Sequence, residues 1–527
     1  MRLLDRAGLV TDRSLTLGDV MARLATIYGD RPVVEEDQGG QSLCLTYREA
    51  AERVDRMAAA LAVGSTPGDR VVLAVPNGYD QLIGAMAASR AGMIAVPINP
   101  QMRPEEIDHV VADSGAERIV RDAGELLAGA EPRLAEAEAD AEVEARRGSP
   151  TDVAAIFYTS GTTGRPKGVE LTHRSLMGAV AAATLWPSWL RRDEVVVALP
   201  VAHIMGFSAL LTIAATGVPV YLLPRFQAGP VLDALERRQA TVFVGVPAMY
   251  RMLLEAGAEK RDLSSVRLWG SGADVMPPDL ARRFRRMGAS YSLPIHLGSL
   301  GSVGDAGFVE AYGMVETGGA VAARISPPGV ALPFSLSGGA LGVPLPGYRM
   351  RVVDEAGGQV GLGKVGELVV KGPGVLTGYH GDRAATAKVL DVDGWLHTGD
   401  LAQRGLGGLV RFAGRAKDVI KSGGYSVYAV EIERAMEEHP DVVEAAALGL
   451  PDSRLGELTV VAVRVREGAA VTEDDLLAWG DERLSSYKRP RRVRIVDDLP
   501  RTGTQKVAKQ RLLPLFATTS HSWPMRE

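Results

Sequence analysis

The sequence predicts an α/β fold, with a large N-terminal domain followed by a smaller α+β C-terminal domain. Three observations support this prediction. Short β-branched runs alternate with helical stretches in the N-terminal half, the chain becomes glycine-rich with alternating strands from Leu341, and a separate strand and helix pattern follows Arg415. Alternation of the first kind is typical of largely parallel sheets covered by helices. A chain of 527 residues also exceeds the usual size of one domain.

In chain order, the expected elements begin with buried strands and the helices between them. Apolar runs rich in valine and isoleucine predict strands at "RVVLAV", "MIAVPI", "AAIFYTS", "EVVVALP", "PVYLLP" and "TVFVGV". The segment "RPEEIDHVVADSG" predicts an amphipathic helix between two of these strands. The segment "FSALLTIAATGVPVYLLP" predicts a buried helix followed by a core strand, because Gly217 and Pro219 interrupt it.

The second half of the chain predicts a β-rich subdomain and then a separate domain. "YRMRVVDEAGGQVGLGKVGELVVKGPGVLTGY" predicts the short strands of the subdomain, and "VVEAAALGLP" and "LTVVAVRVRE" predict strands of the last domain. We place the boundary near Arg415, which gives domains 1–414 and 415–527. The charged segment "AEAEADAEVEARRGSP" predicts a surface linker, and residues 290–308 predict a surface loop, with a lid or membrane-facing flap as the alternative.

Composition and charge exclude several classes of protein. The formal net charge of −5 gives no electrostatic basis for binding nucleic acid. The single cysteine, Cys44, rules out an internal disulfide and fits a reducing compartment. The N-terminal residues lack the apolar run of a signal peptide, and no apolar segment reaches the ~20 residues of a transmembrane helix. We therefore expect a cytoplasmic protein without a transmembrane segment, with peripheral membrane contact as the alternative.

The stretch "IFYTSGTTGRPKGVELTH", residues 156–173, has the features of a phosphate-binding loop. Backbone N–H groups in a glycine-rich turn bind anions, hydroxyls add donors and a lysine adds positive charge. The stretch does not match the P-loop pattern of nucleotide triphosphatases, because Lys167 is followed by Gly168. The residue types alone leave a glycine-rich surface loop as the alternative.

The order of residues in this loop resembles the signature of the acyl-adenylate-forming superfamily, which holds acyl-CoA synthetases, aryl-CoA ligases, luciferases and peptide-synthetase adenylation domains. The resemblance covers nearly the whole chain, from "LTYREAAERVDRMAAAL" to "KQRL". It implies an N-terminal domain with two α/β sheets and a β-barrel-like subdomain, and a mobile C-terminal domain. In the loop it implies an ATP site formed by Thr159, Ser160, Gly161, Thr162, Thr163, Gly164 and Lys167.

Further motifs resemble the family's nucleotide site. "YGMVETGG" resembles its Y-G-x-T-E element, which implies Tyr312 and Gly313 in the adenine site and Glu316 as a ligand of Mg²⁺. A carboxylate beside a triphosphate is repelled unless a divalent cation lies between them. Val315 replaces the family's usual threonine, so a hydroxyl near the α-phosphate is missing. "GSGADVMP" implies that the adenine lies along Ser271, Gly272 and Ala273.

Three motifs towards the C-terminus complete the resemblance. "WLHTGDL" implies that Asp400 binds the ribose hydroxyls, since a carboxylate accepts two such hydrogen bonds. "GRAKDVIKSGGY" implies that Arg415 contacts the nucleotide, that Lys417 is the hinge, that Lys421 lies near the reacting carbonyl, and that Gly423 and Gly424 line the CoA channel. A solvated charged face is the alternative for Lys421. "LPRTGTQKVAKQRL" implies a catalytic Lys506, with Gln505 in place of the usual glycine.

The segment "LPVAHIMGF" resembles the wall of the family's acyl pocket. It implies acyl-pocket positions for His203, Ile204, Phe207 and Ala311, with His203 also a catalytic candidate. Ala311 stands where many relatives have glycine. Amino-acid-activating relatives have an aspartate at the position of Ile204, and an unpaired buried ammonium is costly, so amino acids are not expected as substrates. The neighbouring apolar residues fit an acyl wall or a helix core equally well. We expect a medium- or long-chain fatty acid, with aryl acids second and malonate-like diacids third.

These matches predict an ATP-dependent acyl-CoA synthetase. A small-molecule carboxylic acid and ATP would form an acyl-adenylate and pyrophosphate. CoA would then displace AMP, and Mg²⁺ would be the metal. The alternatives are a ligase that loads an acyl carrier protein, a luciferase-like oxygenase, and a non-catalytic nucleotide- or acyl-binding protein, which Val315 and Gln505 would favour. The short connection between "GELVVKG" and "GWLHTGD" favours CoA, because carrier-loading relatives have an insertion there. The oligomeric state is not specified, and a homodimer is kept as an alternative.

Overall fold

The computed structural model describes residues 8–9, 12–38, 41–128, 148–159, 166–178, 180–183, 193–289, 295–296, 302–327, 340–405, 409–423, 425–502 and 506–517. The chain divides into two compact units. Unit 1 comprises Met1–Met350 and Val369–His397, and unit 2 comprises Arg351–Leu368 and Thr398–Glu527. The expected boundary between residues 414 and 415 falls within unit 2 and stays a prediction. Most of the expected linker and of residues 290–308 lies outside the described residues.

One sheet of unit 1 is a parallel sheet with an antiparallel edge. Its strand order is β19-β7-β6-β4-β3-β5. The strands are β3 (Arg70–Leu73), β4 (Ile94–Pro97), β5 (Arg118–Val120), β6 (Val153–Thr159), β7 (Lys167–Thr172) and β19 (Gly378–Tyr379). β3, β4, β5 and β6 pair in parallel, whereas β7 is antiparallel to both β6 and β19. The strands predicted at "RVVLAV", "MIAVPI" and "AAIFYTS" are confirmed.

The helices beside this sheet follow from capping and apolar patterning. They are α2 (Val20–Tyr28), α3 (Tyr47–Ala62), α4 (Tyr79–Arg90), α5 (Pro104–Ser114) and α6 (Ala123–Ala128). α3 begins at a capping box, in which the Thr46 hydroxyl accepts from the Glu49 N–H and the Glu49 carboxylate accepts from the Thr46 N–H. α5 is the predicted amphipathic helix.

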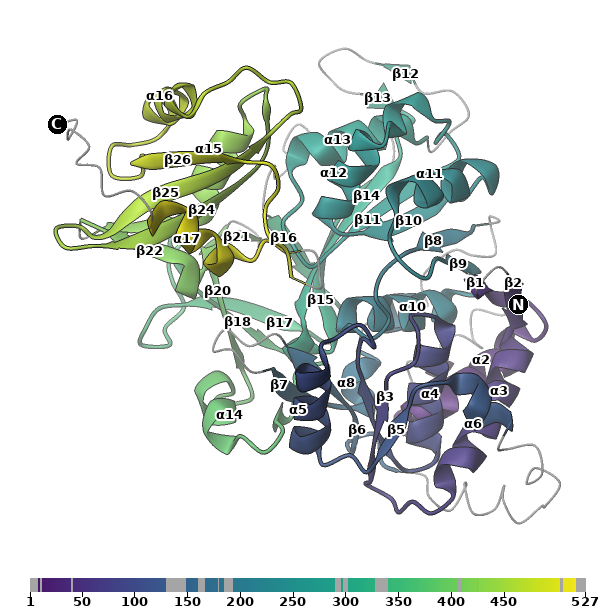
Figure 1. The fold of residues 1–527 in the computed structure, drawn as a ribbon. Helices are drawn as coiled ribbons and strands as arrows, with labels where there is room; N and C mark the ends of the chain where they lie inside the picture. The colour runs from purple at the N-terminus through teal and green to yellow at the C-terminus, as the bar shows by residue number, and fades with distance from the viewer. Residues whose placement is uncertain are drawn as a thin grey trace. The chain divides into compact units, whose positions relative to one another are not determined.

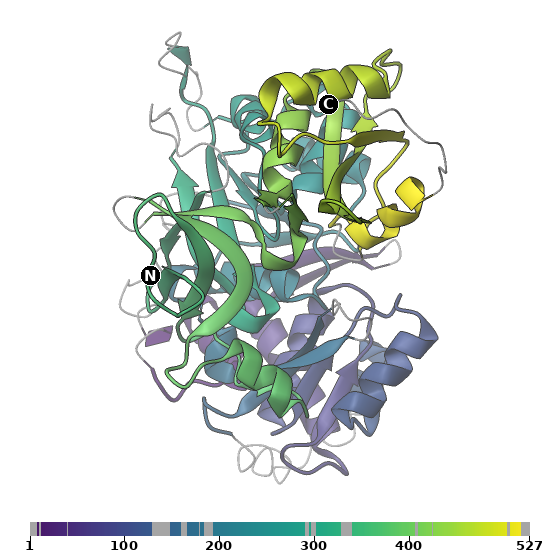
Figure 2. The same ribbon diagram turned by 90° about the vertical axis from the view of Figure 1, so that its left-hand side faces the viewer.

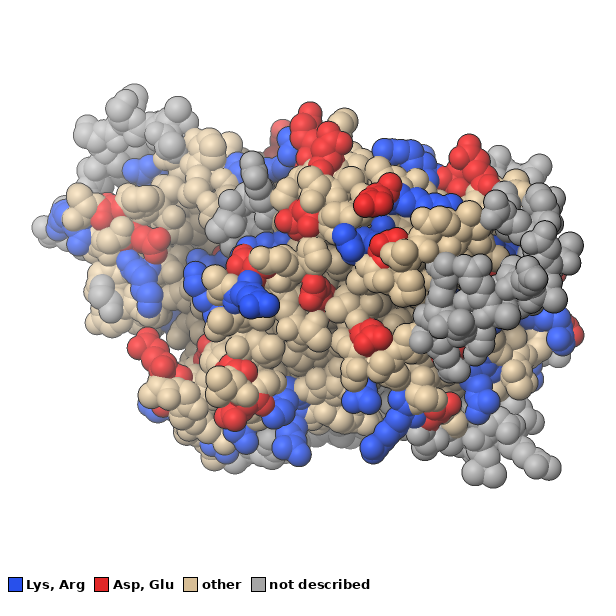
Figure 3. Space-filling model, turned by 90° about the horizontal axis from the view of Figure 1, so that it is seen from below, with Lys and Arg blue, Asp and Glu red and all other residues tan. Residues whose placement is uncertain are grey.

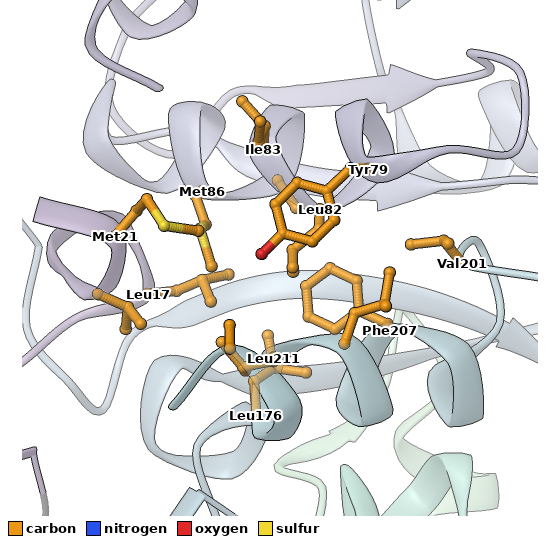
Figure 4. Packing of buried hydrophobic residues seen from close by; sticks show 14 of the residues in the cluster. Leu17, Met21, Tyr79, Leu82, Ile83, Met86, Leu176, Val201, Phe207 and Leu211 are labelled. Carbon is orange, nitrogen blue, oxygen red and sulfur yellow. The ribbon is translucent and has the colours of Figure 1, made fainter. Parts of the chain in front are cut away.

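The main hydrophobic core of unit 1 joins elements that are far apart in sequence. α4 is buried on nearly every side, and its Leu82 and Met86 pack with Leu17 and with Phe207 (Figure 4). Such a helix has apolar residues all round because it has no solvent-facing side. The rings of Phe157 and Phe207 meet edge to face at 5.3 Å, which ties the first sheet to helix α10 (Ile204–Thr216).

The second sheet of unit 1 has the strand order β2-β1-β9-β8-β10-β11-β14-β15-β16. The strands are β1 (Pro32–Gln38), β2 (Gln41–Thr46), β8 (Val195–Val197), β9 (Val220–Leu222), β10 (Val242–Gly245), β11 (Leu268–Ser271), β14 (Gly307–Met314), β15 (Gly319–Ser326) and β16 (Ala340–Pro344). Pairing is parallel from β1 to β14 and antiparallel at both edges. The remaining predicted strands and the helix-then-strand prediction for α10 and β9 are confirmed.

Three helices cover one side of this second sheet (Figure 1). They are α11 (Ala228–Arg237), α12 (Pro247–Glu255) and α13 (Pro278–Met287). Beneath them lies an aromatic cluster, in which the Phe284 ring is 4.8 Å from Tyr250 and 5.0 Å from Trp269. The other short elements of unit 1 are η1 (Leu17–Asp19), α8 (His173–Leu176), α9 (Val180–Ala183), η2 (Ala258–Lys260), β12 (Ile295–His296), β13 (Ser302–Val303), η4 (Val315–Thr317) and α14 (Arg383–Val389).

Unit 2 contains a β-rich part and an α+β part. The sequence predicts both parts but assigns the β-rich part to the N-terminal domain, and that assignment stays a prediction. The β-rich part has the strand order β17-β18-β20-β21, formed by β17 (Arg349–Val353), β18 (Val365–Lys371), β20 (Leu396–Arg404) and β21 (Val410–Arg415). The α+β part has the order β23-β22-β25-β24, with β26 paired to β25. Its elements are η6 (Ala416–Asp418), β22 (Val419–Ser422), β23 (Tyr425–Tyr428), α15 (Ala429–Glu437), β24 (Val442–Asp452), β25 (Gly456–Val465), α16 (Glu473–Arg483), β26 (Arg492–Val496), η7 (Lys509–Leu512) and α17 (Leu513–Ala517).

The α+β sheet of unit 2 has α15 and α16 on one side and α17 on the other (Figures 1 and 2), and successive side chains of β24 point alternately to the two sides. Ala445 and Ala447 face the cluster that includes Ile432 of α15 and Leu476 of α16. Ala446 and Leu448 belong to the opposite cluster, with residues of η7 and α17. An independent core of this kind is what a separate folding unit requires.

The described residues can be compared with the patterns of a membrane-spanning helix and of a strongly charged surface. Among the described residues, no helix combines the length and apolar character that a bilayer crossing demands. On the face that Figure 3 shows, acidic and basic side chains are interspersed without a broad area of one sign. The slightly negative net charge of −5 agrees with this mixed distribution.

Candidate active site

The predicted phosphate loop connects two antiparallel strands. Its ends are held by the pairing of Thr159, the last residue of β6, with Lys167, the first residue of β7. Ser160, Gly161, Thr162, Thr163 and Gly164 lie outside the described residues. The Lys167 ammonium is 3.6 Å from the Asp382 carboxylate and 5.3 Å from the centre of the Tyr379 ring. The lysine is therefore held at the base of the loop.

Glu316, the predicted ligand of magnesium, lies in the short helix η4. Its Oε1 accepts a hydrogen bond of 3.0 Å from the hydroxyl of Tyr379, and its backbone oxygen accepts from the Leu376 N–H at 2.9 Å. Burial and the Glu316 charge raise the pKa of Tyr379, so its hydroxyl keeps the proton that it donates. Tyr379 therefore links Glu316 to Lys167. Sequence reasoning missed this tyrosine, because "LTGY" carries no recognisable motif of its own.

The side chain of Val315 is buried among apolar residues. It is 8% exposed and belongs to the main hydrophobic core of unit 1. The nearest hydroxyl along the chain, that of Thr317, is fully buried; it accepts from the Met314 N–H and donates to backbone oxygens of the same turn. Thr317 therefore stabilises η4 locally, and its hydroxyl is already committed to the backbone.

The segment predicted to lie along the adenine has a strained backbone. Ala273 has a positive φ of 67°, which side chains with a Cβ rarely adopt and which is typical of functional sites. Ser271 is buried, and its Oγ has no hydrogen-bond partner among the described residues. A Cβ at Gly272 would lie 3.2 Å from the Met205 side chain and 3.4 Å from the Ala311 oxygen. The structure thus brings three predicted segments together at Gly272.

Tyr312 and Gly313 lie at an irregularity between β14 and β15. The register shifts between these two residues, and a Cβ at Gly313 would lie 2.0 Å from the Gly319 oxygen. Only glycine allows this close approach of the two strands. Gly313 therefore fixes the path by which the chain passes from Tyr312 to Glu316.

The predicted acyl-pocket residues fall into two groups. His203 is the N-terminal cap of α10, where its Nδ1 accepts from the Met205 N–H at 3.3 Å. Ile204 and Phe207 are buried in the hydrophobic core, where Phe207 packs on Phe157. Their pocket roles stay predictions, because an apolar helix shows the same pattern whether it faces a core or a pocket. Met205 and Ala311, which meet beside Gly272, are only partly buried.

Asp400 and Arg415, the two predicted nucleotide contacts of unit 2, lie opposite each other on neighbouring strands. They are direct partners in the antiparallel pairing of β20 and β21. The Arg415 Nε is 3.3 Å from the Asp400 carboxylate, and Asp400 is only 4% exposed. The structure therefore brings these two residues together.

The expected hinge and CoA-channel residues follow directly after β21. The pKa of Lys417, in η6, is lowered because neighbouring atoms partly shield the ammonium from water and because Arg415 is close. The Lys421 ammonium donates to the Ser426 hydroxyl at 2.7 Å, and its N–H donates to Glu457. Gly423 has a φ of 57° and its N–H donates to the Leu455 oxygen. Gly424 lies outside the described residues.

Lys506, the expected catalytic lysine, lies between β26 and η7. Its backbone oxygen accepts from the Thr502 N–H at 2.8 Å, and Arg501 and Val507 form a β-bridge. Gln505 lies outside the described residues. These contacts hold the backbone of Lys506 within unit 2, while its catalytic role stays a prediction.

Glu316 fits a magnesium ion that is held mainly by phosphate oxygens. Its Oε2 takes no hydrogen bond from any described residue, which leaves that oxygen available to a cation. Within the described part of the chain, no group of three or more His, Cys, Asp or Glu side chains converges as a metal site. Magnesium in nucleotide enzymes is commonly bound by one or two carboxylates together with the substrate phosphates.

A Ser/Thr/Gly segment between two paired strands, followed by a lysine and with a tethered carboxylate nearby, is the arrangement expected of a nucleotide-binding enzyme. The AMP-binding enzyme family matches residues 22–380, and the AMP-binding enzyme C-terminal domain matches residues 431–506. The chain therefore belongs to the AMP-binding enzyme family. This membership confirms the predicted acyl-adenylate-forming superfamily and its mixed α/β fold with a separate C-terminal domain.

Several relatives are known by function or structure. Feruloyl-CoA synthase from Amycolatopsis sp is 36% identical over 482 residues, which are 88% of this chain and 92% of the relative. A fatty acid–[acyl-carrier-protein] ligase, ScoC, from Streptomyces coeruleorubidus is 32% identical over 90% of this chain and 92% of its own length. ATP-bound MatB from Rhodopseudomonas palustris has a TM-score of 0.77 at 29% identity, covering 96% of this chain and 99% of the relative.

A further solved relative bears on the metal. The o-succinylbenzoate CoA synthetase MenE from Bacillus subtilis, in complex with ATP and a magnesium ion, has a TM-score of 0.75 at 26% identity and covers 94% of this chain and 99% of the relative. These comparisons confirm the predicted enzyme class, an AMP-forming acid–thiol ligase. They also confirm the expected ATP, Mg²⁺ and CoA at the level of the family.

Proposed function

We propose that this chain is an ATP-dependent ligase that joins an apolar carboxylic acid to CoA through an acyl-adenylate. The observation that carries the proposal is the convergence in unit 1 of Lys167, Tyr379 and Glu316 at the base of the Ser/Thr/Gly hairpin. An ammonium and a carboxylate that can hold a divalent cation are the two groups that a bound triphosphate needs.

The reaction has two steps. In the first step an oxygen of the substrate carboxylate attacks the α-phosphate of ATP, the bond to the β-phosphate breaks, and pyrophosphate leaves. Lys167 and Lys506 would stabilise the negative charge that develops, Asp400 and Arg415 would orient the nucleotide, and magnesium when bound would add positive charge beside Glu316. In the second step the CoA thiol loses its proton and attacks the acyl carbonyl, and AMP leaves.

We further propose that the acid is aromatic or similarly bulky. The sequence alone favours a fatty acid and places aryl acids second, but feruloyl-CoA synthase is similar over 88% of this chain at 36% identity. The residues around Gly272 offer an apolar side chain, Met205, and the small Ala311, and Ile204 stands where amino-acid-activating relatives have an aspartate that pairs the α-ammonium. A flat apolar ring system suits such walls, and amino acids do not.

A pyrophosphate-release assay with ATP and magnesium tests both proposals together. The acids would include ferulate, 4-coumarate, benzoate, malonate, and fatty acids from acetate to palmitate, each with and without CoA. We expect continuous CoA-dependent release with the phenylpropenoic acids. Selectivity for aliphatic acids would overturn the aryl proposal, and silence with every acid would overturn the ligase and favour a non-catalytic binding protein.

The same assay addresses a carrier protein as acceptor, which the similarity to ScoC supports. Release that stalls after one equivalent, with or without CoA, and resumes when a phosphopantetheinylated carrier protein is added would replace CoA by that carrier. The thioester product, identified by mass spectrometry, names the acceptor directly.

A further inference from the structure

Tyr379 is fixed to the strand that begins at Lys167. It pairs with Val169 in the antiparallel ladder of β19 and β7, and its own N–H donates to the Thr386 hydroxyl at 2.9 Å. The next residue, His380, repeats the attachment, because its N–H donates to the Gly168 oxygen at 2.8 Å and its ring contacts Glu170 at 2.7 Å. The backbone of Tyr379 is thus held on both sides of the residue.

The side chain of Tyr379 reaches from this strand to Glu316. Its hydroxyl donates to Oε1 of Glu316 at 3.0 Å, and the segment that leads into β19 holds the Glu316 backbone through the Leu376 N–H. The ring of the same tyrosine lies 5.3 Å from the Lys167 ammonium, which also meets Asp382 at 3.6 Å. One side chain therefore contacts both the carboxylate and the cation that the proposed reaction places at the triphosphate.

A carboxylate without a partner rotates about its last side-chain bond, which is a broad, weakly restrained torsion. A single donor to one oxygen fixes that rotation and leaves the other oxygen for a cation. Groups that hydrogen-bond a metal ligand in this way orient it, and their removal commonly costs about 10- to 100-fold in metal affinity or activity.

We propose that Tyr379 is a positioning residue that orients Glu316 toward the magnesium ion of Mg²⁺·ATP and keeps Lys167 at the base of the phosphate loop. The inference rests on the proposed function for the identity of the nucleotide. Tyr379 belongs to none of the motifs identified in the sequence. The phenolic oxygen of Tyr379, rather than its ring, should determine the affinity for the metal ion.

The test compares Tyr379→Phe with the wild type. The phenylalanine keeps the ring beside Lys167 and removes only the oxygen that meets Glu316. Binding of Mn²⁺ in the presence of ATP, followed by electron paramagnetic resonance, gives a readout that needs no acid and no turnover. We expect Tyr379→Phe to weaken Mn²⁺ binding about 10- to 100-fold and to raise the magnesium concentration for half-maximal pyrophosphate release by a similar factor.

Two further variants make the test specific. Tyr221→Phe is the matched control, because Tyr221 is also partly buried and has a cation over its ring, with Arg238 at 4.2 Å, but lies on β9, which carries none of the predicted site residues. It is expected to bind Mn²⁺ as the wild type does. In Glu316→Gln the metal ligand itself is changed, and adding Tyr379→Phe to it is expected to cause little further loss, because the tyrosine acts through the glutamate.

The outcomes separate this inference from the proposed function. If the wild type binds Mn²⁺ with ATP but releases no pyrophosphate with any acid, the ligase proposal fails and the binding comparison still decides the role of Tyr379. Unchanged Mn²⁺ affinity in Tyr379→Phe, or losses that multiply fully in the double variant, would overturn the inference. Absence of Mn²⁺ binding by the wild type in the presence of ATP would overturn it as well.

Discussion

The charged site residues of the two units are assembled in different ways. In unit 1, Glu316 meets a tyrosine 63 residues further along the chain, and Lys167 meets Asp382. In unit 2, Lys421 meets a serine five residues away, and Asp400 meets Arg415 across a single strand pair. The unit 1 site therefore depends on tertiary structure, whereas the unit 2 groups depend on local pairing. Changes to single groups of unit 2 should therefore alter individual rates or binding constants, whereas changes to long-range contacts of unit 1 should alter its stability.

The largest expected effect is on a single group of unit 2. Lys506→Ala is expected to slow adenylation by about 10²–10³, as for the loss of one donor that stabilises developing charge. Thioester formation from a supplied acyl-adenylate is expected to continue, since that step makes and breaks no bond to phosphorus. The two half-reactions are measured separately, by pyrophosphate release and by thioester yield. Equal losses in both would show that Lys506 is structural or serves both steps.

The next effect concerns the long-range contacts of unit 1. His173 is buried, its Nδ1 accepts from the Leu17 N–H at 3.3 Å and lies 3.2 Å from the Ser89 hydroxyl. Burial lowers the pKa of His173 from 6.5 to about 4, so the folded state favours the neutral ring while the unfolded state takes up a proton first. The contribution of His173 to the free energy of unfolding is therefore fully present above pH 6.5. It decreases by about 3 kcal/mol as the pH falls towards 4.

Chemical denaturation between pH 4 and pH 7, compared with His173→Asn, measures that loss. The asparagine cannot titrate in this range, so its unfolding free energy should depend less steeply on pH, whatever its absolute stability. Hydrogen exchange resolved along the chain should place the acid sensitivity in unit 1. An identical pH dependence in the variant would show that other groups are responsible.

A smaller effect is expected when the local pair of unit 2 is changed. Asp400→Asn keeps the size of the side chain but removes its charge, so hydrogen bonds to the ribose hydroxyls should weaken by about 1.5–3 kcal/mol, or roughly 10- to 100-fold in the KM for ATP. The KM for the acid should change little. The exposed Asp497→Asn, also in unit 2, is the control. A change confined to kcat would contradict a ribose-binding role.

The smallest effect on the reaction is expected at Val315. Val315→Thr introduces the threonine hydroxyl that most family members have at this position. Here the hydroxyl would lie in an apolar core, which should lower the free energy of unfolding by about 1–3 kcal/mol. Adenylation should change by less than about tenfold, well below the effect of losing a charged donor. Val54→Thr is the control, because Val54 is buried in the same core on α3. It should lower the free energy of unfolding without changing the rate of adenylation. A hundredfold faster Val315→Thr would show that the missing hydroxyl limits the enzyme.

Local patterns predicted the fold well because they report on local structure. The strands, the amphipathic α5 and the buried α10 followed from period and composition alone. The long motifs singled out Lys167, Glu316, Asp400 and Arg415, whose functional roles stay predictions. Tyr379 escaped prediction because its partner is set by the pairing of β19 with β7, and nothing in "LTGY" specifies that pairing. The role of Phe207 stayed ambiguous for a different reason, since a ring against a core and a ring against a substrate need the same apolar neighbours.

The left-handed backbone of Ala273 has a consequence for redesign of the substrate range. β-branched and bulky side chains are strongly disfavoured at a φ of 67°, and a Cβ at Gly272 would press on the end of the Met205 side chain at 3.2 Å. A mutant library across this segment is therefore expected to tolerate few residue types at 273 and only small ones at 272. Randomised positions are better placed at Met205 and Ala311, where the backbone φ is not positive.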